Sequence, residues 1–254
     1  MSEFLDIAKQ VVREAGTLAL QCQPREVYRY KANREIVTWG DVQVEEYVIS
    51  ALRRRFPDHG FDSEERGTEG AEAEYVWILD PIDGTRYYVG GIPLYAVSLA
   101  LRHRQELILG IVYGPELGQT YVALSGHGAT MNDRRITCSS KSRIEEISVC
   151  LEIPSRDSPP EQLPWAMEKM VTLVRHTRRV RILGVGSLGL CFCAAGGFDV
   201  YVNLGSATKL CDVAAGHVMV EEAGGQFLSL GEGNSPIIAG PESLCSQIRE
   251  LLGL

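Results

Sequence analysis

A run of apolar residues at positions 75–79 leads directly into residues 80–85, Asp-Pro-Ile-Asp-Gly-Thr, and this junction constrains the fold more than any other part of the chain. Pro81 biases the residue before it toward an extended backbone, so we expect a buried strand that stops at Asp80. Pro81 also fixes its own φ angle and starts a turn. That turn is expected to swing Asp83 round until its carboxylate faces that of Asp80.

The two residues that follow the turn suit contact with an anion. Gly84 lets the backbone approach a ligand closely, and the amides of Gly84 and Thr85 then become donors for it. Two converging carboxylates beside free amides and a hydroxyl are the groups needed to hold a metal-bound phosphate. Asp, Pro and Gly are also common in ordinary strand-to-turn connections, but their close succession after a buried strand favours the phosphate site over that alternative.

The overall charge and the apolar content narrow the class of protein. The chain has 33 acidic and 25 basic residues and a net charge of −8, which argues against non-specific binding to nucleic acid, because such binding requires a basic surface. No apolar run reaches the roughly 18–20 residues of a membrane span. The first residues lack the basic and apolar segments of a signal peptide. We therefore expect a cytoplasmic protein with no membrane or nucleic-acid partner.

The seven cysteines and five histidines show no metal-ligand spacing. The cysteines are scattered, odd in number and mostly set among apolar residues, which is typical of buried free thiols in a reducing compartment rather than of disulfides or zinc ligands. An acidic chain that binds phosphate nevertheless needs a cation to reverse the local field. Oxygen ligands without a His or Cys cluster point to Mg²⁺ or Mn²⁺ rather than zinc.

Periodicity and turn signals predict an alternation of helices and strands, with an antiparallel middle section. Helices flank strands throughout, which favours an α+β fold, a layered sandwich, over a parallel doubly wound sheet. We expect one domain over residues 1–254, built from two intimate halves, 1–145 and 146–254, with a proline-rich loop at 154–164 near the boundary. Helices are predicted at 3–22, 41–56, 165–176, 187–196, 212–222 and 242–252, and strands at 75–79, 95–103, 107–113, 119–124, 147–151, 179–183, 199–202, 226–228 and 237–239.

Further acidic residues lie near the ends of predicted elements. Glu64 and Glu65 form a turn before the central strand, and Asp212 stands at the start of a helix rich in small residues. Asp41 follows Thr38 at a spacing typical of a helix entry and is expected to cap the helix that begins there. Each, taken alone, has a structural explanation as a solvated loop or a helix cap. Together, on separate elements, they can assemble a site for two metal ions roughly 3.5–4 Å apart.

Three segments together resemble the inositol monophosphatase family. They are residues 80–85, the Glu-Glu turn before them, and residues 211–216 (Cys-Asp-Val-Ala-Ala-Gly) followed by 222–225 (Glu-Ala-Gly-Gly). This family comprises Mg²⁺-dependent, lithium-sensitive phosphatases and includes archaeal-type fructose-1,6-bisphosphatases and 3′-phosphoadenosine nucleotidases. The resemblance covers nearly the whole chain and implies a five-layered αβαβα sandwich, usually as a homodimer.

The resemblance also implies a role for each matching residue. Thr85, with Asp41 behind it, orients the attacking water, and the amides of Gly84 and Thr85 bind the phosphate. Lys31 resembles a basic residue of a mobile loop. Two or three Mg²⁺ ions, with Mn²⁺ as an alternative, lower the pKa of the water and stabilise the leaving group. The implied metal ligands are Glu64, Asp80, the Ile82 carbonyl, Asp83 and Asp212, with Glu64 also counted as catalytic, and the implied substrate-binding residues are Asp83, Gly84, Thr85, Gly186, Ser187, Leu188, Asn203 and Asp212.

Several positions depart from the family pattern. Ser63 replaces the usual Gly before the Glu-Glu turn, and Cys211 replaces a common Trp. Tyr87 and Tyr88 stand where the inositol phosphatases usually have Asn-Phe. Around Asn203 the family often has a Glu or Asp that hydrogen-bonds the substrate diol. The implied metal ligands are thus intact, whereas the residues that contact the substrate are not standard.

We therefore expect Mg²⁺-dependent hydrolysis of a small polyol or sugar phosphate monoester, with inositol 1-phosphate as the first candidate. Fructose-1,6-bisphosphatase and 3′(2′),5′-bisphosphate nucleotidase activities are the alternatives within the family. Outside the enzymes, the alternative is a non-catalytic scaffold that binds a phosphorylated ligand. A basic cluster at 175–181 is either a contact for a second phosphate or, as we prefer, a solvated helix end and strand start.

Overall fold

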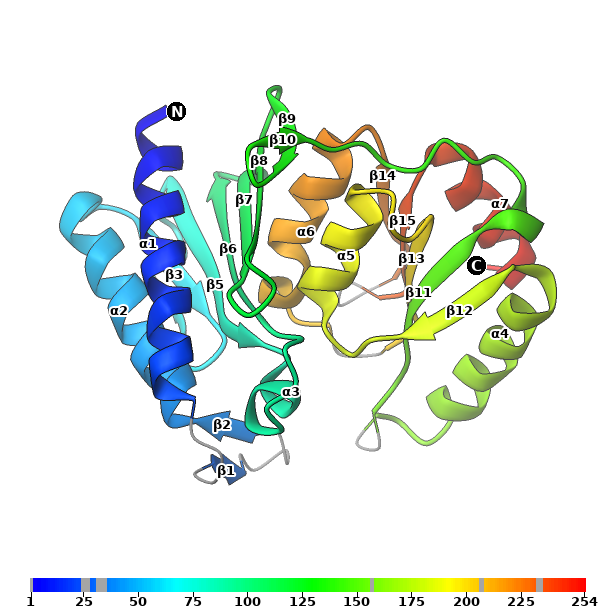
Figure 1. Cartoon of the computed structure of the whole chain (residues 1–254), viewed down its shortest axis with the longest axis horizontal. Coiled ribbons are helices and arrows are strands. Elements are labelled where there is room, and N and C mark those ends of the chain that lie inside the picture. Colours follow the sequence, from blue (N-terminus) through cyan, green and yellow to red (C-terminus); the bar gives the residue numbers. More distant parts are fainter. Residues whose placement is uncertain (1, 24–27, 31–35, 156–157, 206–207, 232–234) are drawn as a thin grey trace.

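The computed structural model describes residues 2–23, 28–30, 36–155, 158–205, 208–231 and 235–254. It contains an eight-stranded sheet and a five-stranded sheet, which are separated and covered by helices (Figure 1). The layers run helix, sheet, helix, sheet, helix, so the α+β layered sandwich expected from the sequence is confirmed. Lys31, for which the resemblance implied a loop role, lies outside the described residues.

The first outer layer is the pair of helices α1 (Ser2–Cys22) and α2 (Trp39–Arg55), which pack on the eight-stranded sheet. The N-cap of α2 is Thr38, so the prediction that Asp41 caps this helix was wrong. Asp41 instead stands three residues inside the cap. There its carboxylate accepts the Thr38 amide at 2.7 Å while Thr38 Oγ1 accepts the Asp41 amide at 3.2 Å, a reciprocal capping box.

In the eight-stranded sheet, the strand β5 (Tyr75–Asp83) lies between β6 (Ala96–His103) and β3 (Gly60–Ser63). β3 is its parallel neighbour and β6 its antiparallel neighbour. β5 continues through Pro81 to Asp83 instead of stopping at Asp80. Its pairing with β6 shifts register between Asp80 and Asp83, and this irregularity accommodates Pro81, which has no amide hydrogen to donate. The other strands, in spatial order, are β10 (Arg134–Arg135), β9 (Gly128–Met131), β8 (Gln119–Leu124), β7 (Glu106–Gly114), β6 (Ala96–His103), then beyond β5, β3 (Gly60–Ser63) and β4 (Gly67–Glu69).

Short elements lie at the edges of this first half of the chain. β1 (Tyr28–Tyr30) and β2 (Ile36–Thr38) form a separate two-stranded ribbon. The helix α3 (Thr85–Val89) follows β5 directly, and the 3₁₀ turn η1 (Ile144–Glu146) leads into the second sheet. The sequence patterns predicted none of these, because segments of three to five residues are too short to show a period.

The middle layer consists of α5 (Gly186–Ala194) and α6 (Leu210–Glu222), which lie between the two sheets (Figure 1). Both helices are apolar nearly all round and contribute to one large buried cluster, as expected for helices covered on both sides. α6 begins at Leu210 after Lys209, so Asp212 is the third helical residue and not the cap that the sequence predicted. Its carboxylate accepts the Lys209 amide at 2.9 Å, which satisfies one of the exposed amides of the helix start.

The five-stranded sheet is mixed, with β11 (Ser148–Glu152) parallel to both of its neighbours. The outer layer against it is α4 (Gln162–His176) and α7 (Glu242–Leu252). α4 begins inside the region predicted to be a loop and contains Pro164, which the first turn of a helix tolerates because its amides lack intrahelical partners. The strand order is β12 (Arg179–Ile182), β11, β13 (Val200–Asn203), β15 (Ile237–Gly240) and β14 (Gln226–Ser229).

The cysteines, the helix lengths and the arginine cluster bear on three expectations from the sequence. All seven cysteines are free, and five of them are buried, as the sequence predicted. None of the helices in the described part of the chain is both long and apolar enough to cross a membrane. Arg175, Arg178, Arg179 and Arg181 are exposed at the end of α4 and along the edge strand β12, as expected for a solvated cluster.

The contact between β7 and α6 generates a stability prediction. A Cβ atom on Gly110 would lie 2.4 Å from the carbonyl oxygen of Ala215 in α6, so Gly110→Ala must push the helix away from the sheet. We expect it to lower the free energy of unfolding by about 1–3 kcal/mol, measured as a fall in Tm. Gly114→Ala on the same strand is the control, since its Cβ would meet only the flexible side chain of Leu117, at 3.3 Å. Equal Tm values for the two variants would contradict this packing argument.

Candidate active site

The strands of both sheets that run parallel end at one cavity of about 330 Å³. β3 and β5 pair with Ser63 opposite Leu79, so Glu64 and Asp80 follow at matching positions, Glu64 just after the end of β3 and Asp80 where the pairing of β5 with β6 becomes irregular. In the second sheet, Glu152 at the end of β11 pairs with Asn203 at the end of β13. Side chains at the carboxyl ends of parallel strands collect at the same edge of a sheet, which is where open α/β sheets bind their ligands.

Most residues that the sequence assigned to the site line this cavity, and three do not. Asp41, Ser187 and Leu188 are fully buried outside its lining. Leu188 belongs to the apolar cluster between the sheets, so its side chain contributes to the core. The predicted residues that do line the cavity are Glu64, Asp80, Ile82, Asp83, Gly84, Thr85, Gly186, Asn203 and Asp212.

The carboxylates of the cavity repel one another and are poorly hydrated. Burial, together with the charge of Glu64 and of the other nearby acids, raises the pKa of Asp80 well above its ordinary value. Burial raises the pKa of Asp83 to about 8, against the hydrogen bonds from Ser187. Burial and Glu64 raise the pKa of Asp212 to about 6. Each shift disfavours the charged form, so the cavity strongly favours any positive charge that enters it.

Asp80 and Asp83 are each held through one carboxylate oxygen, by donors from different parts of the fold. The Ile82 amide donates to Asp80 Oδ1 at 3.0 Å. The amide of Ser187 donates to Asp83 Oδ2 at 2.8 Å, and its hydroxyl donates to the same oxygen. Among the described residues, Asp83 Oδ1 has no hydrogen-bond donor. This arrangement fixes each carboxylate while it leaves coordinating capacity directed at the cavity.

The oxygen atoms available as metal ligands suit a hard divalent cation, because they belong to carboxylates and to the Ile82 carbonyl. Within the described ranges, no three of the His, Cys, Asp and Glu side chains already stand close enough to enclose an ion. A dication bound among the acids would attract each of their carboxylates. The residues that would hold Mg²⁺ or Mn²⁺ are those that resemblance implied, namely Glu64, Asp80, Ile82, Asp83 and Asp212, and their role as ligands stays a prediction.

Thr85 and Asp41 are not joined by a hydrogen bond in the structure. Thr85 begins α3 and its hydroxyl donates to the Ile82 carbonyl at 3.0 Å, on the cavity side. Asp41 Oδ2 is taken by the Thr38 amide and hydroxyl, and Asp41 Oδ1 is buried with no partner among the described residues. Burial raises the pKa of Asp41 to about 7, and the charges of Glu65 and Glu64 add to the shift. Asp41 is therefore close to the acidic cluster but behind the cavity wall.

Gly84 is required where it stands. Its φ angle is 91°, in the left-handed region, and a Cβ atom there would lie 2.8 Å from the Leu94 carbonyl oxygen. The residue thus turns the chain sharply from β5 into α3 and brings Thr85 to the cavity. Tyr87, two residues later, donates its hydroxyl to the Leu183 carbonyl and so connects α3 to the loop before α5.

The turn that carries Glu64 is anchored by Glu45, a residue that sequence reasoning missed. Glu45 is buried on α2, and its Oε1 accepts the Ser63 hydroxyl at 2.6 Å and the amides of Glu65 and Arg66 at 3.1 and 3.2 Å. Glu64 itself receives Lys209 Nζ at 2.9 Å, which connects the turn to the start of α6. Glu45 stands one position after the apolar Val44 in a helix, and a buried acid of this kind gives no signal in a hydrophobic pattern.

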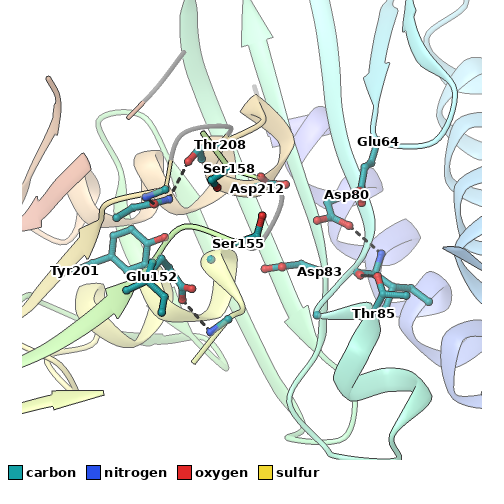
Figure 2. A pocket seen from close by; sticks show the side chains of 17 residues that line it. Glu64, Asp80, Asp83, Thr85, Glu152, Ser155, Ser158, Tyr201, Thr208 and Asp212 are labelled. Atoms are coloured by element: carbon teal, nitrogen blue, oxygen red, sulfur yellow. Dashed lines mark hydrogen bonds between the residues drawn. The ribbon is translucent and has the colours of Figure 1, made fainter. Parts of the chain in front are cut away.

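The sequence also missed the wall opposite the acids. Glu152 and Tyr201 lie across the cavity from Asp80 and Thr85 (Figure 2). Burial raises the pKa of Glu152 to about 7, while the amides of Gly184 and Val185 oppose the shift. Glu152 directly follows a predicted strand, as Asp80 does, and this shared position was the available signal. Ser155, Ser158, Gly205 and Thr208 also line this side.

A substitution of Asp212 can distinguish a structural role at the helix start from a role in binding a metal ion. Asp212→Asn keeps an oxygen that can accept the Lys209 amide, but it loses the charge that a hard dication needs. We expect the Tm of the metal-free variant to stay within a few degrees of wild type. Affinity for Mg²⁺, measured by calorimetry, should fall roughly tenfold or more, because replacing even outer partners of a metal site costs that much.

Asp62→Asn is the control for this experiment, since Asp62 accepts the Thr68 hydroxyl outside the cavity. Its Mg²⁺ affinity should match wild type. If the Asp212 variant also kept wild-type affinity, Asp212 would serve only to satisfy the helix start.

Curated relatives match most or all of the chain. It is 32% identical to the Nus factor SuhB of Haemophilus influenzae over 100% of this chain and 98% of that protein. It is 34% identical to the human inositol monophosphatase 2, over 91% of this chain and 80% of that one. It is 32% identical to the fructose-1,6-bisphosphatase/inositol-1-monophosphatase of Aquifex aeolicus, over 96% and 93% respectively.

Solved structures agree with these relatives. The extragenic suppressor protein suhB of Bartonella henselae superposes with a TM-score of 0.91 at 27% identity, over 98% of each chain. The IMPase of Thermotoga maritima gives a TM-score of 0.88 at 28% identity, over 100% of this chain and 97% of that one. The sequence model of the inositol monophosphatase family matches residues 1–252. The chain therefore belongs to the inositol monophosphatase family.

Proposed function

We propose that the protein hydrolyses a small polyol or sugar phosphate monoester in a Mg²⁺-dependent reaction, with inositol 1-phosphate as the expected substrate. One observation carries the proposal: the acids and the hydroxyl that this chemistry needs all line a single cavity. They are Glu64, Asp80, Asp83, Thr85 and Asp212. A descendant that had lost catalysis would be expected to have lost at least one of these acids.

The chain's own groups would position the reactants. Bound divalent ions would supply positive charge to the phosphate oxygens and lower the pKa of a water molecule. The hydroxyl of Thr85 would orient that water for in-line attack on phosphorus, and the amides at Gly84 and Thr85 would hold a phosphate oxygen. Phosphoryl transfer needs positioning and charge stabilisation more than covalent help, so no phosphoenzyme is invoked.

The relatives support more than one substrate and one alternative role. One relative is named for both fructose-1,6-bisphosphatase and inositol-1-monophosphatase, and others are named Nus factors. Phosphate release from inositol 1-phosphate, fructose 1,6-bisphosphate and 3′-phosphoadenosine 5′-phosphate would separate the enzymatic candidates. No turnover across a broad panel of phosphate esters would favour a non-catalytic scaffold that binds a phosphorylated ligand. We also propose that the protein is cytoplasmic, which the free thiols support, and that it is a homodimer, which the family resemblance supports.

The stability of the metal-free protein should depend on pH, and so should the increase in stability that Mg²⁺ produces. The pKa values of Asp80, Asp83 and Asp212 are raised above 3.8, so the folded metal-free protein binds more protons than the unfolded chain. Its stability therefore falls as pH rises from about 4 to about 8. Saturating Mg²⁺ should raise Tm by on the order of 5 °C at pH 8 and by less at pH 5, where it must displace protons.

The same samples should lose phosphatase activity in excess chelator and regain it when Mg²⁺ is restored. Na⁺ at equal ionic strength is the control for electrostatic screening of the acids by salt. Full activity at a metal content near zero would rule out the metal-dependent mechanism, and an equal Tm increase at both pH values would contradict the assignment of these acids as ligands. Inhibition by Li⁺ is a further expectation that rests on the family resemblance.

Thr85 can be tested by removing its hydroxyl. Thr85→Ala should lower kcat by roughly 10²-fold with a smaller change in KM, because it removes a positioned group rather than a binding contact. Thr85→Ser should retain much of the rate. Thr130→Ala, which removes a hydroxyl that also donates to a carbonyl but lies on β9 away from the cavity, is the control. Wild-type kcat in the Thr85→Ala variant would exclude the hydroxyl from the reaction.

A further inference from the structure

The cavity has two chemically different walls, and the proposed hydrolysis uses only one of them. The acids of the first sheet, Thr85 and Asp212 account for the metal and phosphate side. The opposite side presents Glu152, at the end of β11, and Tyr201 of β13 (Figure 2). A substrate whose phosphate lies against the first wall must place its alcohol portion against this second one.

Glu152 is held in a fixed position at the end of β11. Its Oε1 accepts the Gly184 amide at 3.0 Å, and the Val185 amide also donates to the carboxylate. Both amides belong to the loop that leads into α5. The side chain is half-buried and lines the cavity, so part of its acceptor capacity faces the ligand space. Its charge also contributes to raising the pKa of Asp83 across the cavity.

Tyr201 supplies an independent sign of a missing partner. Its side chain is fully buried, yet its hydroxyl has no hydrogen-bond partner in the part of the chain that the structure describes. Burial raises the pKa of this phenol, and the charge of Glu152, which lines the same wall, adds to the shift (Figure 2). Leaving a buried hydroxyl unsatisfied costs about 1–3 kcal/mol, so the position is best explained by a ligand that completes it.

Two further polar side chains of this wall, those of Asn203 and Thr208, bond to the local chain. Asn203 Nδ2 donates to Thr208 Oγ1 at 2.9 Å, and Asn203 Oδ1 accepts the Gly205 amide at 2.7 Å. These bonds hold the loop that follows β13. Recognition of a ligand by a charged acceptor on this wall therefore falls to Glu152.

We propose that Glu152 and Tyr201 form a subsite that binds the hydroxyl groups of an uncharged polyol and disfavours a substrate carrying a second phosphate. This inference rests on the proposed phosphatase function. A carboxylate accepts hydrogen bonds from neighbouring hydroxyls strongly, because charge-assisted bonds are shorter and stronger than neutral ones. The same negative charge repels a second phosphate group placed near it. The substrate class is thus a polyol monophosphate rather than a bisphosphate.

Three substrates and three variants test the subsite. The esters are fructose 1-phosphate, fructose 1,6-bisphosphate, which differs only by the second phosphate, and p-nitrophenyl phosphate, which has no alcohol hydroxyl. Glu152→Gln retains an oxygen for the Gly184 amide and removes the charge. Tyr201→Phe removes only the hydroxyl. Glu222→Gln is the matched control, since Glu222 also accepts two loop amides, those of Gly126 and Gly128, but lies outside the cavity. Assays at pH 8 keep Glu152 mainly charged, because its pKa is about 7.

The readouts are ratios of kcat/KM, which a general loss of structure would not change. In Glu152→Gln, the ratio for bisphosphate over fructose 1-phosphate should rise roughly tenfold, since juxtaposed like charges are costly. In both cavity variants, the ratio for fructose 1-phosphate over p-nitrophenyl phosphate should fall, by roughly tenfold for Glu152→Gln. The Glu222→Gln variant should keep the wild-type ratios.

The outcomes distinguish this inference from the function on which it rests. If wild type hydrolyses these esters but both ratios stay constant in the cavity variants, Glu152 only anchors the loop at Gly184 and the subsite is refuted. A parallel fall for all three esters would lead to the same conclusion. If wild type releases phosphate neither from these esters nor from inositol 1-phosphate, the proposed function itself fails, and the subsite fails with it. A Glu152→Gln variant that does not melt cooperatively would leave the decision to Tyr201→Phe.

Discussion

Repulsion among buried carboxylates is the constraint that the rest of the structure accommodates. Five acids line one cavity, and burial in each other's field raises the pKa values of most of them. The fold tolerates them because each receives a donor from its own surroundings: backbone amides, the Ser187 hydroxyl or the ammonium group of Lys209. Such donors reduce the cost of the charges without neutralising them all, so a cation that bound among these acids would stabilise the arrangement further.

A further layer of hydrogen bonds behind the cavity keeps the acids in place. The buried carboxylate of Glu45 anchors the turn that carries Glu64 by accepting the Ser63 hydroxyl. Arg66 Nε lies 3.3 Å from Glu45 Oε2. Ser63, which departs from the glycine common in the family, supplies one of the donors to Glu45. The departure therefore leaves the ligand turn anchored. Supporting contacts of this kind set the orientation of first ligands in metal sites generally.

The sequence predicted the parts of this site that depend on local chemistry. The apolar strand that leads to Asp80 and the order of the longer helices and strands follow from residue type and spacing, and the grouping of distant acids followed from family resemblance. The continuation of β5 past Pro81 was not predictable, because it depends on a register shift against β6. Leu188 is buried and Glu152 lines the cavity because of the way the two sheets pack around α5. No local sequence pattern encodes that packing.

The two walls of the cavity come from separate stretches of chain. The strands that carry Asp80 and Asp83 or lead to Glu64 belong to the eight-stranded sheet, whose strands all precede residue 136, and those that carry Glu152 and Tyr201 belong to the five-stranded sheet, whose strands all follow residue 147. Mutations that reshape the second wall would therefore leave the strands near Glu64, Asp80 and Asp83 undisturbed, whereas Asp212 on α6 belongs to the second stretch. Under the proposed function, such a division would make new specificities accessible by gradual evolution, since each intermediate would keep most of its hydrolytic groups while its preference for the alcohol changed.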